Sequence, residues 1–450
     1  MKRIIWKSAL LLVLALTAVS QSGTWAGTVI STSDGFTISE RLALLRDVVK
    51  VTEFDQPGDL FTENYEVWFK QKIDPSDPNS PTFNQKVLIS HVSFDAPVFV
   101  ELQGYTIWSS AAGELAKLYQ GNQITIEHRF FDESRPEKNI PWEFLTVANA
   151  AYDQHIIIET LKRALYPRNK FISTGISKGG QTTMIHRSIY PDDVDASVCY
   201  VAPLNFERED PRIYEFLKSV GTEEQRQQIQ DFQMMCLKRK EELMPIFKEM
   251  AKQKKWKWEV KTEMAFELYV LEYSFAFWQW GDVKFNQIPG EKAKAKAVLD
   301  HLLKVAGVSF FEIKGVDNNR PFFWAALTEM GIYGYEHEPF KEYLSQQSTY
   351  LFDFTFPKGE NQEFDPAPMK RVNDFIQANA ETMIFIYGEL DTWSATAVEL
   401  SSEATSRGLK KYVLEGGHHG TRIRHFSKRE QDDIIETLSE WIGIEAPEMD

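Results

Sequence analysis

The 450-residue sequence contains only two cysteines, Cys199 and Cys236. Two cysteines exclude a fold built on several disulfides and leave two alternatives, one bridge in an exported protein or two free buried thiols. No internal repeat and no low-complexity segment is present. The sequence also lacks an HExxH motif and any clustered Cys/His spacing, so we predict no metal site.

Positive charge is in deficit, because 50 Lys and Arg stand against 65 Asp and Glu, for a net charge of −15. So acidic a surface argues against nucleic acid or an anionic membrane as a partner and leaves neutral or basic substrates open. Aromatic residues make up 13% of the chain, enough for a sizeable core. The length suits a large enzyme core with an insertion, or two domains.

Long apolar runs are absent except at the N-terminus, where residues 9–19 are apolar apart from Thr17. These 11 residues are too few to span a bilayer and have the length of a signal-peptide core. Basic residues precede the run and small residues suited to cleavage follow it: Lys2, Arg3 and Lys7, then Ala18 and Ser20 or Thr24 and Ala26. We predict a signal peptide over residues 1–26, export to the periplasm or the extracellular space, and no other membrane contact. The alternative is a retained membrane anchor.

Short apolar segments alternate with helical patterns up to about residue 206, after a mixed, loop-rich stretch over residues 28–85. This alternation predicts an α/β fold, a mostly parallel sheet with helices on both faces. Residues 207–375 are helical in pattern and rich in Lys, Glu, Phe and Trp, and the sheet pattern returns at 381–391 and 409–420. We predict a core formed by residues 27–206 and 376–450, split by a helical insertion.

Residues 175–179 read GISKG and follow the strand-like run FIST. Gly-x-Ser-x-Gly between a strand and a helix is the pattern of a nucleophile elbow, in which a strained turn projects the serine hydroxyl from the sheet. Ser177 is therefore the candidate nucleophile, and the backbone N–H of Lys178 is a candidate oxyanion donor. The pattern also occurs by chance, and the alternative is an ordinary turn.

A serine nucleophile needs a base, and the base needs a group that orients it. Asp391 follows the apolar segment MIFIYG, and the pair His418–His419 follows KYVLE, each at the end of an expected strand and in the chain order Ser, acid, His. We favour His419 as the base and keep His418 as the alternative. A helix N-cap is the structural alternative for Asp391, and a metal site is the alternative for the two histidines.

The second oxyanion donor should come from the loop that follows an earlier strand. The segment LQGYT, residues 102–106, follows the strand-like PVFVE, so the backbone at Gly104 or Tyr105 is the candidate. A plain turn is the alternative.

The segments EHRFFDESRP, ISTGISKGG, YPDDVDASVCYVAPL and GELDTWSA together resemble the bacterial secreted tripeptidyl aminopeptidases, serine peptidase family 37. The chain is similar, more distantly, to the group of prolyl carboxypeptidase and dipeptidyl-peptidase II. The resemblance covers about residues 86–420. It implies an α/β-hydrolase core with a helical cap, no cofactor, and cleavage of short peptides from free N-termini, often near proline. Carried over, Ser177 is the nucleophile, Asp391 the orienting acid and His419 the base.

An exopeptidase of this kind must also bind a charged terminus, and a carboxylate binds an ammonium group. The candidates for this contact are the acids Glu127, Asp132, Glu133 and Glu272. The cap aromatics Trp278 and Trp280 are candidates for lining a pocket for proline or apolar side chains. Surface charge, ion pairing with Arg129 and core packing are the structural alternatives. The same core also suits an esterase or lipase, or a catalytically silent binding protein, because fold does not determine substrate.

Overall fold

The computed structural model describes residues 35–448, except residues 57, 59, 346, 347, 349 and 350, and the backbone of Arg3–Ile4. Apart from that dipeptide, the predicted signal peptide and its cleavage sites lie outside the described residues. Within the described part of the chain, none of the helices combines the length and the apolar character that crossing a bilayer requires.

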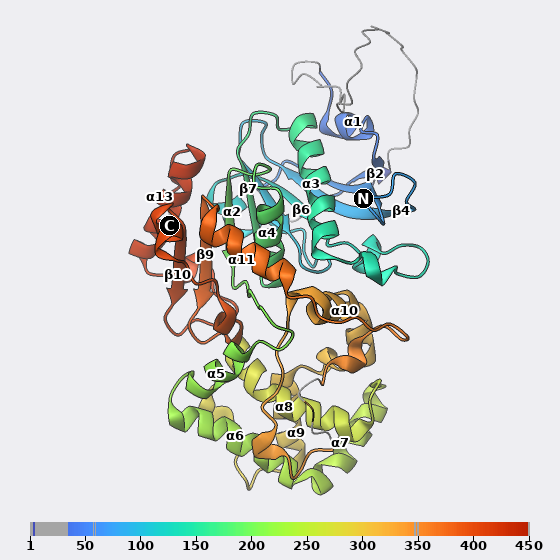
Figure 1. Cartoon of the computed structure of the whole chain (residues 1–450), viewed down its shortest axis with the longest axis vertical. Helices are drawn as coiled ribbons and strands as arrows, with labels where there is room; N and C mark the ends of the chain where they lie inside the picture. Colours follow the sequence, from blue (N-terminus) through green and yellow to red (C-terminus); the bar gives the residue numbers. More distant parts are fainter. Residues whose placement is uncertain are drawn as a thin grey trace.

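One twisted sheet forms the centre of the fold, with its strands in the order β1-β2-β3-β4-β6-β5-β7-β8-β9-β10 (Figure 1). From β6 to β10 neighbouring strands are parallel, whereas β1 to β4 pair antiparallel and β4 pairs antiparallel with β6. The strands are β1 (Arg3–Ile4), β2 (Val48–Glu53), β3 (Glu63–Lys72), β4 (Thr82–His91), β5 (Val98–Leu102), β6 (Asn122–Ile126), β7 (Phe171–Ile176), β8 (Ala196–Tyr200), β9 (Met383–Gly388) and β10 (Lys410–Leu414). An α/β-hydrolase sheet has this strand order, in which one antiparallel strand, here β4, lies beside the parallel strands. The predicted fold class is therefore confirmed.

Helices cover both faces of the sheet, and alternate residues of β9 show which face each helix covers. Met383, Phe385 and Tyr387 pack with α3, α4 and α11, whereas Ile384 and Ile386 pack with α2 and α13. The helices of the first face are α3 (Val147–Ala164), α4 (Lys178–Ile189) and α11 (Ala367–Ala378), and those of the second are α2 (Glu114–Leu118) and α13 (Lys428–Ile442). The central strands are buried along their whole length, which explains why they read as unbroken apolar runs.

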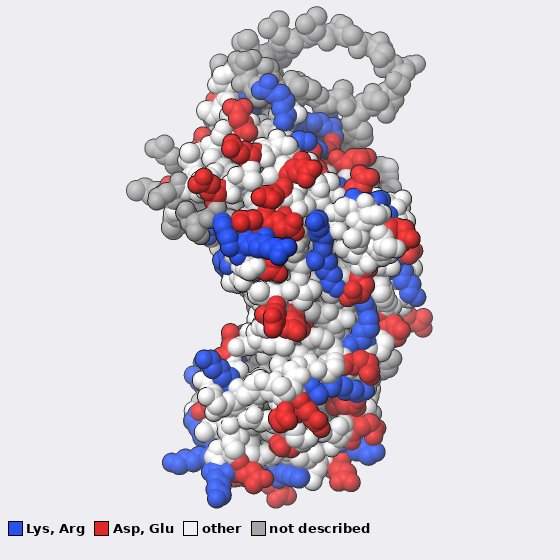
Figure 2. Space-filling view, turned by 90° about the vertical axis from the view of Figure 1, so that its left-hand side faces the viewer, with Lys and Arg blue, Asp and Glu red and all other residues white. Residues whose placement is uncertain are grey.

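The insertion between β8 and β9 forms a helical cap with an aromatic-rich core of its own, the lower lobe in Figure 1. Its helices are α5 (Pro211–Ser219), α6 (Glu223–Lys238), α7 (Lys240–Lys254), α8 (Thr262–Trp280), α9 (Ala295–Ala306) and α10 (Ile313–Ala325). The predicted limit at residue 375 falls inside α11, which packs on the sheet in the same cluster as α4. In Figure 2 the outline narrows between the two lobes, and acidic and basic side chains are mixed over the visible face.

Two expectations from the sequence are settled by the packing. The stretch 28–85 is not loop-rich throughout, because β2, β3 and the start of β4 form an antiparallel ribbon within it, with Lys72 opposite Thr82. Cys199 lies in β8 and Cys236 in α6, and both are free buried thiols, so the alternative without a disulfide holds.

Candidate active site

Ser177 occupies a strained turn between β7 and α4. Its φ of 58° and ψ of −125° lie in a region that non-glycine residues rarely adopt. The backbone N–H of Ser177 donates to Tyr200 O of β8 at 2.9 Å, which fixes the turn against the neighbouring strand. At Gly175 a Cβ atom would lie 2.2 Å from Gly179 O, so a side chain there would force the strand and the helix apart. The expected strand–turn–helix geometry is present.

Asp391 and His419 are hydrogen-bonded at the carboxyl edge of the sheet. Asp391 follows β9, His419 follows β10, and His419 Nδ1 lies 2.7 Å from Asp391 Oδ2. Asp391 is fully buried, and its Oδ1 also accepts from the backbone N–H of Trp393 at 3.1 Å. The carboxylate thus caps a helical turn and orients a histidine at once. With Nδ1 donating to the carboxylate, His419 Nε2 keeps its lone pair.

His418 points to the cap instead. Its Nδ1 donates to Trp278 O at 2.7 Å, and the backbone N–H of His419 donates to Gln279 O at 2.8 Å. These carbonyls belong to the last turn of α8, where main-chain acceptors have no partner within the helix. The exposed ring of Trp280 packs edge-on against His419, with 5.4 Å between ring centroids. Of the two histidines, therefore, His419 contacts the acid and His418 ties the cap to the turn that carries it.

Ser177 and the Asp391–His419 pair come from β7, β9 and β10, which are parallel and separated only by β8. Their carboxyl ends therefore meet at one edge of the sheet. In the part of the chain that the structure describes, no hydrogen bond joins Ser177 to His419. Such bonds are often long before a substrate is bound.

Two backbone N–H groups beside Ser177 have no acceptor among the described residues, those of Tyr105 and Lys178. The loop after β5 is pressed against the start of α4: a Cβ atom at Gly104 would lie 2.6 Å from Gly179 N. The Tyr105 phenol interacts with the Ser177 side chain, and burial raises the pKa of this tyrosine. In the described part of the chain, the arrangement leaves two N–H donors without an acceptor beside the serine.

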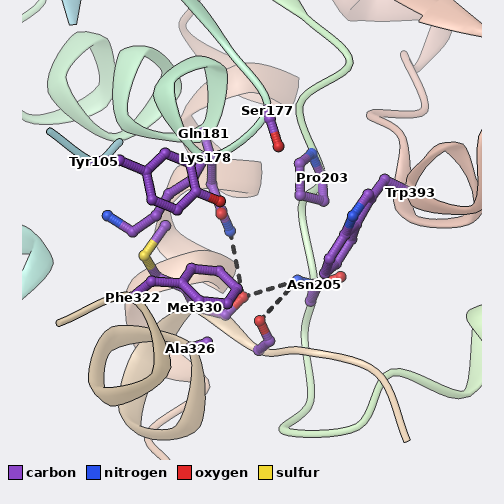
Figure 3. Close-up of a pocket in the computed structure, with 11 residues that line it drawn as sticks. Tyr105, Ser177, Lys178, Gln181, Pro203, Asn205, Phe322, Ala326, Met330 and Trp393 are labelled. Carbon is purple, nitrogen blue, oxygen red and sulfur yellow. Dashed lines mark hydrogen bonds between the residues drawn. The ribbon is translucent and has the colours of Figure 1, made fainter. Parts of the chain in front are cut away.

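A pocket opens in front of Ser177, whose side chain points into it (Figure 3). The core contributes residues that follow four strands, β5, β7, β8 and β9, and residues of α4, and the cap contributes α10 and the π-helical turn Ala326–Met330 that follows it. Gln181 Nε2 and Asn205 Nδ2 both donate to Met330 O, at 3.3 and 3.0 Å, and so hold the cap turn against the core. The pocket is lined by Tyr105, Ser177, Lys178, Gln181, Pro203, Asn205, Phe322, Ala326, Met330, Gly331 and Trp393.

Of these lining residues, sequence reasoning assigned a role only to Tyr105, Ser177 and Lys178. Pro203 and Asn205 lie in the loop that follows β8, and Trp393 follows Asp391 by two positions, so their places after strands were available signals. Nothing in the sequence indicated the cap residues, because their contribution depends on how α10 and the π turn pack on the core.

Two of the acids proposed to bind substrate have other partners. Glu127 is buried and accepts four hydrogen bonds, from the hydroxyl and backbone N–H of Ser134, the Thr106 hydroxyl and the Ile107 N–H. It therefore joins the loops after β5 and β6, and it does not form the ion pair with Arg129 that was its structural alternative, because Arg129 pairs with Asp153. Glu133 lies on the surface and pairs with Lys86 at 2.6 Å. Neither lines the pocket.

Glu272 and Trp278 lie in α8 of the cap. Trp278 packs in the cap core. Glu272 is buried and accepts from the hydroxyls of Tyr333, at 2.9 Å, and Tyr335, at 2.5 Å. The structure pairs it with no cation among the described residues, and burial raises the pKa of Glu272 to about 8. Tyr333 packs against Trp393, which lines the pocket, with 5.4 Å between ring centroids. Glu272 therefore lies one aromatic side chain behind the pocket wall.

An α/β-hydrolase sheet that carries a strained serine, a buried acid–histidine pair and two free N–H donors defines a hydrolase of the serine type. The model of the PS-10 peptidase S37 family matches residues 36–449, and the chain belongs to this family of serine peptidases.

Among characterised proteins, the chain is similar to the prolyl tri/tetrapeptidyl aminopeptidase of Streptomyces mobaraensis, with 28% identity over 386 residues that cover 84% of this chain and 79% of that protein. Among solved structures it is similar to the proline iminopeptidase of Mycobacterium smegmatis, with a TM-score of 0.43 and 12% identity over 83% of this chain and 98% of that one. The structure of VinJ gives a TM-score of 0.42 and 12% identity over 83% of this chain and 99% of that one.

Proposed function

We propose that this peptidase is an exported exopeptidase that releases short peptides, chiefly tripeptides, from free N-termini, and that Ser177, His419 and Asp391 are its catalytic triad. The 2.7 Å contact between His419 Nδ1 and Asp391 Oδ2, at the sheet edge that carries the strained serine, is the main support. The similarity to a prolyl tri/tetrapeptidyl aminopeptidase supports the length of the product and a proline near the scissile bond.

In the proposed reaction, His419 Nε2 takes the Ser177 hydroxyl proton while Oγ attacks the carbonyl carbon of the scissile peptide. The backbone N–H groups of Lys178 and Tyr105 donate to the oxyanion of the tetrahedral intermediate. The C–N bond then breaks, and His419 gives its proton to the leaving amine. A water molecule, deprotonated by the same histidine, hydrolyses the acyl-enzyme and restores Ser177.

Glu272 is the acid best placed to receive the substrate's ammonium group. Burial without a cationic partner favours the protonated form of Glu272, and an incoming ammonium would supply the charge that favours its carboxylate. Tyr333 separates Glu272 from the pocket wall at Trp393, so the ammonium would bind on the cap side, away from the scissile bond. The distance between the two ends of the site would set the number of residues released.

A panel of chromogenic tripeptides with free and blocked N-termini tests the proposal, together with mass spectrometry of the products from a defined peptide. We expect turnover of the free-amine substrates only, and tripeptides as the main product. Equal turnover of blocked peptides would exclude an aminopeptidase, and activity on acyl esters without activity on peptides would identify an esterase.

Asp391→Asn is expected to lower kcat about 10⁴-fold, because an amide no longer fixes the tautomer in which Nε2 is free to accept a proton. KM should change little, since Asp391 does not line the pocket. Steady-state kinetics on a free-amine tripeptide measures both values.

Asp193→Asn is the matched control for this change. Asp193 also pairs with histidines, accepting from His186 Nε2 at 3.0 Å and His155 Nδ1 at 2.9 Å, but it lies before β8, at the opposite edge of the sheet. Its replacement should cost stability and leave kcat near the wild-type value. A similar fall in kcat for both variants would contradict the role of Asp391.

Glu272→Gln is expected to remove a pH dependence of stability. Between pH 4.5, the ordinary pKa of a glutamate, and about 8, its pKa here, the folded protein holds a proton that the unfolded chain has released. The wild-type free energy of unfolding should therefore fall as pH rises through this window, by up to about 1.4 kcal/mol per pH unit from this group. Relative to wild type, the variant should gain stability from pH 5 to pH 8 in urea unfolding.

The control for Glu272 is Glu267, on the same helix, whose carboxylate pairs with Lys240 at 2.5 Å. Glu267→Gln breaks this ion pair and should lose stability at both pH values. If Glu272→Gln is less stable than wild type by the same amount at pH 5 and pH 8, then Glu272 is not protonated in the folded protein.

A further inference from the structure

The side chain of Lys178 is buried beside the nucleophile, yet the proposed reaction uses only its backbone. Only 2% of the residue is exposed, and Nζ donates to Gly104 O at 2.8 Å. Among the described residues no carboxylate pairs with it, and burial lowers the pKa of Lys178 to about 7. Burying an ammonium group against a single main-chain carbonyl costs free energy. The role of this contact therefore lies in what it does to the Gly104 carbonyl.

The carbonyl of Gly104 belongs to the same peptide unit as the N–H of Tyr105. In a planar trans peptide the C=O and N–H bonds point in opposite directions, so holding the oxygen sets the direction of the hydrogen. Lys178 Nζ holds this oxygen, and the Tyr105 N–H on the other side has no acceptor. In Figure 3 the Lys178 side chain runs past Tyr105 and away from the pocket, as this geometry requires.

The chain around this peptide unit is anchored elsewhere. On one side, the next peptide unit is held because the backbone N–H of His128 donates to Tyr105 O at 3.1 Å. On the other side, the unit between Leu102 and Gln103, two units back, is held because the N–H of Gln103 donates to Ile126 O at 3.1 Å. The peptide between Gly104 and Tyr105 is bonded to Lys178 alone. The rings of Tyr105 and Phe131 lie 5.9 and 5.4 Å from Nζ and hold the ammonium in place.

We propose that Lys178 positions the oxyanion site: its backbone supplies one N–H donor, and its side chain aims the second, the N–H of Tyr105, by holding the Gly104 carbonyl. This inference rests on the proposed function of Ser177. A donor that is aligned before the reaction stabilises the oxyanion without reorganisation, and a positive charge on the carbonyl end of the peptide strengthens its N–H as a donor. Lys178 is thus a positioning residue for the transition state and not for the bound substrate.

The test compares Lys178→Met with Lys162→Met. Lys162 is a matched control because its Nζ also donates to a main-chain carbonyl, Asp193 O at 2.9 Å, and also lies near an aromatic ring, that of Phe171 at 5.3 Å, but away from the site. The measurements are kcat and KM on a free-amine tripeptide, and the inhibition constants of a peptide boronic acid and of the released tripeptide. The boronic acid forms a tetrahedral adduct with the serine, whereas the tripeptide binds only as a ground-state ligand.

For Lys178→Met we expect kcat to fall about 10- to 100-fold, less than the loss of a whole oxyanion donor, with KM within about twofold of wild type. The boronic acid should bind more weakly by the same factor as kcat falls, and binding of the tripeptide should not change. Lys162→Met should match wild type in all four values.

Equal losses in Lys178→Met and Lys162→Met, or equal weakening of the boronic acid and the tripeptide, would overturn the role of Lys178. If Lys178→Met does not fold, Lys178→Gln keeps an N–H donor without the charge, and the same comparison applies to it. If the proposed function itself is wrong, the boronic acid will not inhibit the wild-type protein. That result is distinct from a failure of the role proposed for Lys178.

Discussion

Ser177→Ala is expected to lower kcat about 10⁶-fold, because no other group can form the acyl-enzyme and the remaining site offers only binding and oxyanion donors. KM for a free-amine tripeptide should stay close to the wild-type value, since the hydroxyl is a small part of the pocket wall. A fluorophosphonate should label the wild-type protein and not the variant.

Ser188→Ala, at the far end of the same helix, is the control, and it should keep full activity and labelling. Ser177→Gly distinguishes the loss of the nucleophile from the relief of backbone strain at this position. It should be as inactive as Ser177→Ala and yet more stable than wild type by on the order of 1 kcal/mol, because glycine relieves the strain at φ 58° but loses more backbone entropy on folding. Residual turnover of Ser177→Ala above a few per cent of wild type, by a protein free of wild-type contamination, would refute Ser177 as the nucleophile.

The histidine pair provides the second large effect. His419→Ala should lower kcat about 10⁶-fold, as loss of the nucleophile does, since a base and a nucleophile that act as one unit are lost together. His418→Ala removes the hydrogen bond from Nδ1 to Trp278 O, worth about 1 kcal/mol, and should reduce activity by no more than about tenfold.

The two variants control for each other, because they remove the same side chain from adjacent positions of one turn. Both should unfold at temperatures within a few degrees of wild type, as measured by calorimetry. The opposite order of activities, with His418→Ala the weaker enzyme, would assign the base to His418 and require the turn to rearrange when substrate binds.

At the ends of β7, β9 and β10, the sequence predicted which residues of the site lie there, but not all of their contacts. The elbow is a local structure, in which a strand, a glycine-flanked turn and a helix follow one another within 20 residues, so its motif can be read directly. Asp391 follows the apolar strand β9 and His419 follows β10, and parallel strands place their carboxyl ends at one edge. At these strand ends, the structure was needed to show which partner each of the two histidines contacts, because the side chains of adjacent residues in a turn point in different directions.

The ribbon of β2 and β3 shows a different limit. The burial of β2 follows no regular alternation, and β3 alternates buried with mostly half-buried positions before the turn DPSDPNSP. This weak pattern does not stand out beside the apolar central strands. Four of the six candidates for substrate binding show another limit of prediction from the sequence. Glu127, Glu133, Glu272 and Trp278 are alike in the sequence as charged or aromatic residues near a motif, and only their contacts distinguish a loop anchor, a surface pair, an isolated buried acid and a core side chain.

The sequence by itself determined the family, the α/β-hydrolase core, the elbow at Ser177 and the two strand ends that carry Asp391 and His419. These features depend on short-range order, such as periodic burial, glycine in a tight turn and polar residues directly after a strand. The tertiary structure decided which histidine meets the acid, which cap residues close the pocket, and that the Lys178 side chain reaches the Gly104 carbonyl. Each of these depends on the packing of segments 28 to 125 residues apart, and no local pattern encodes contacts over such separations.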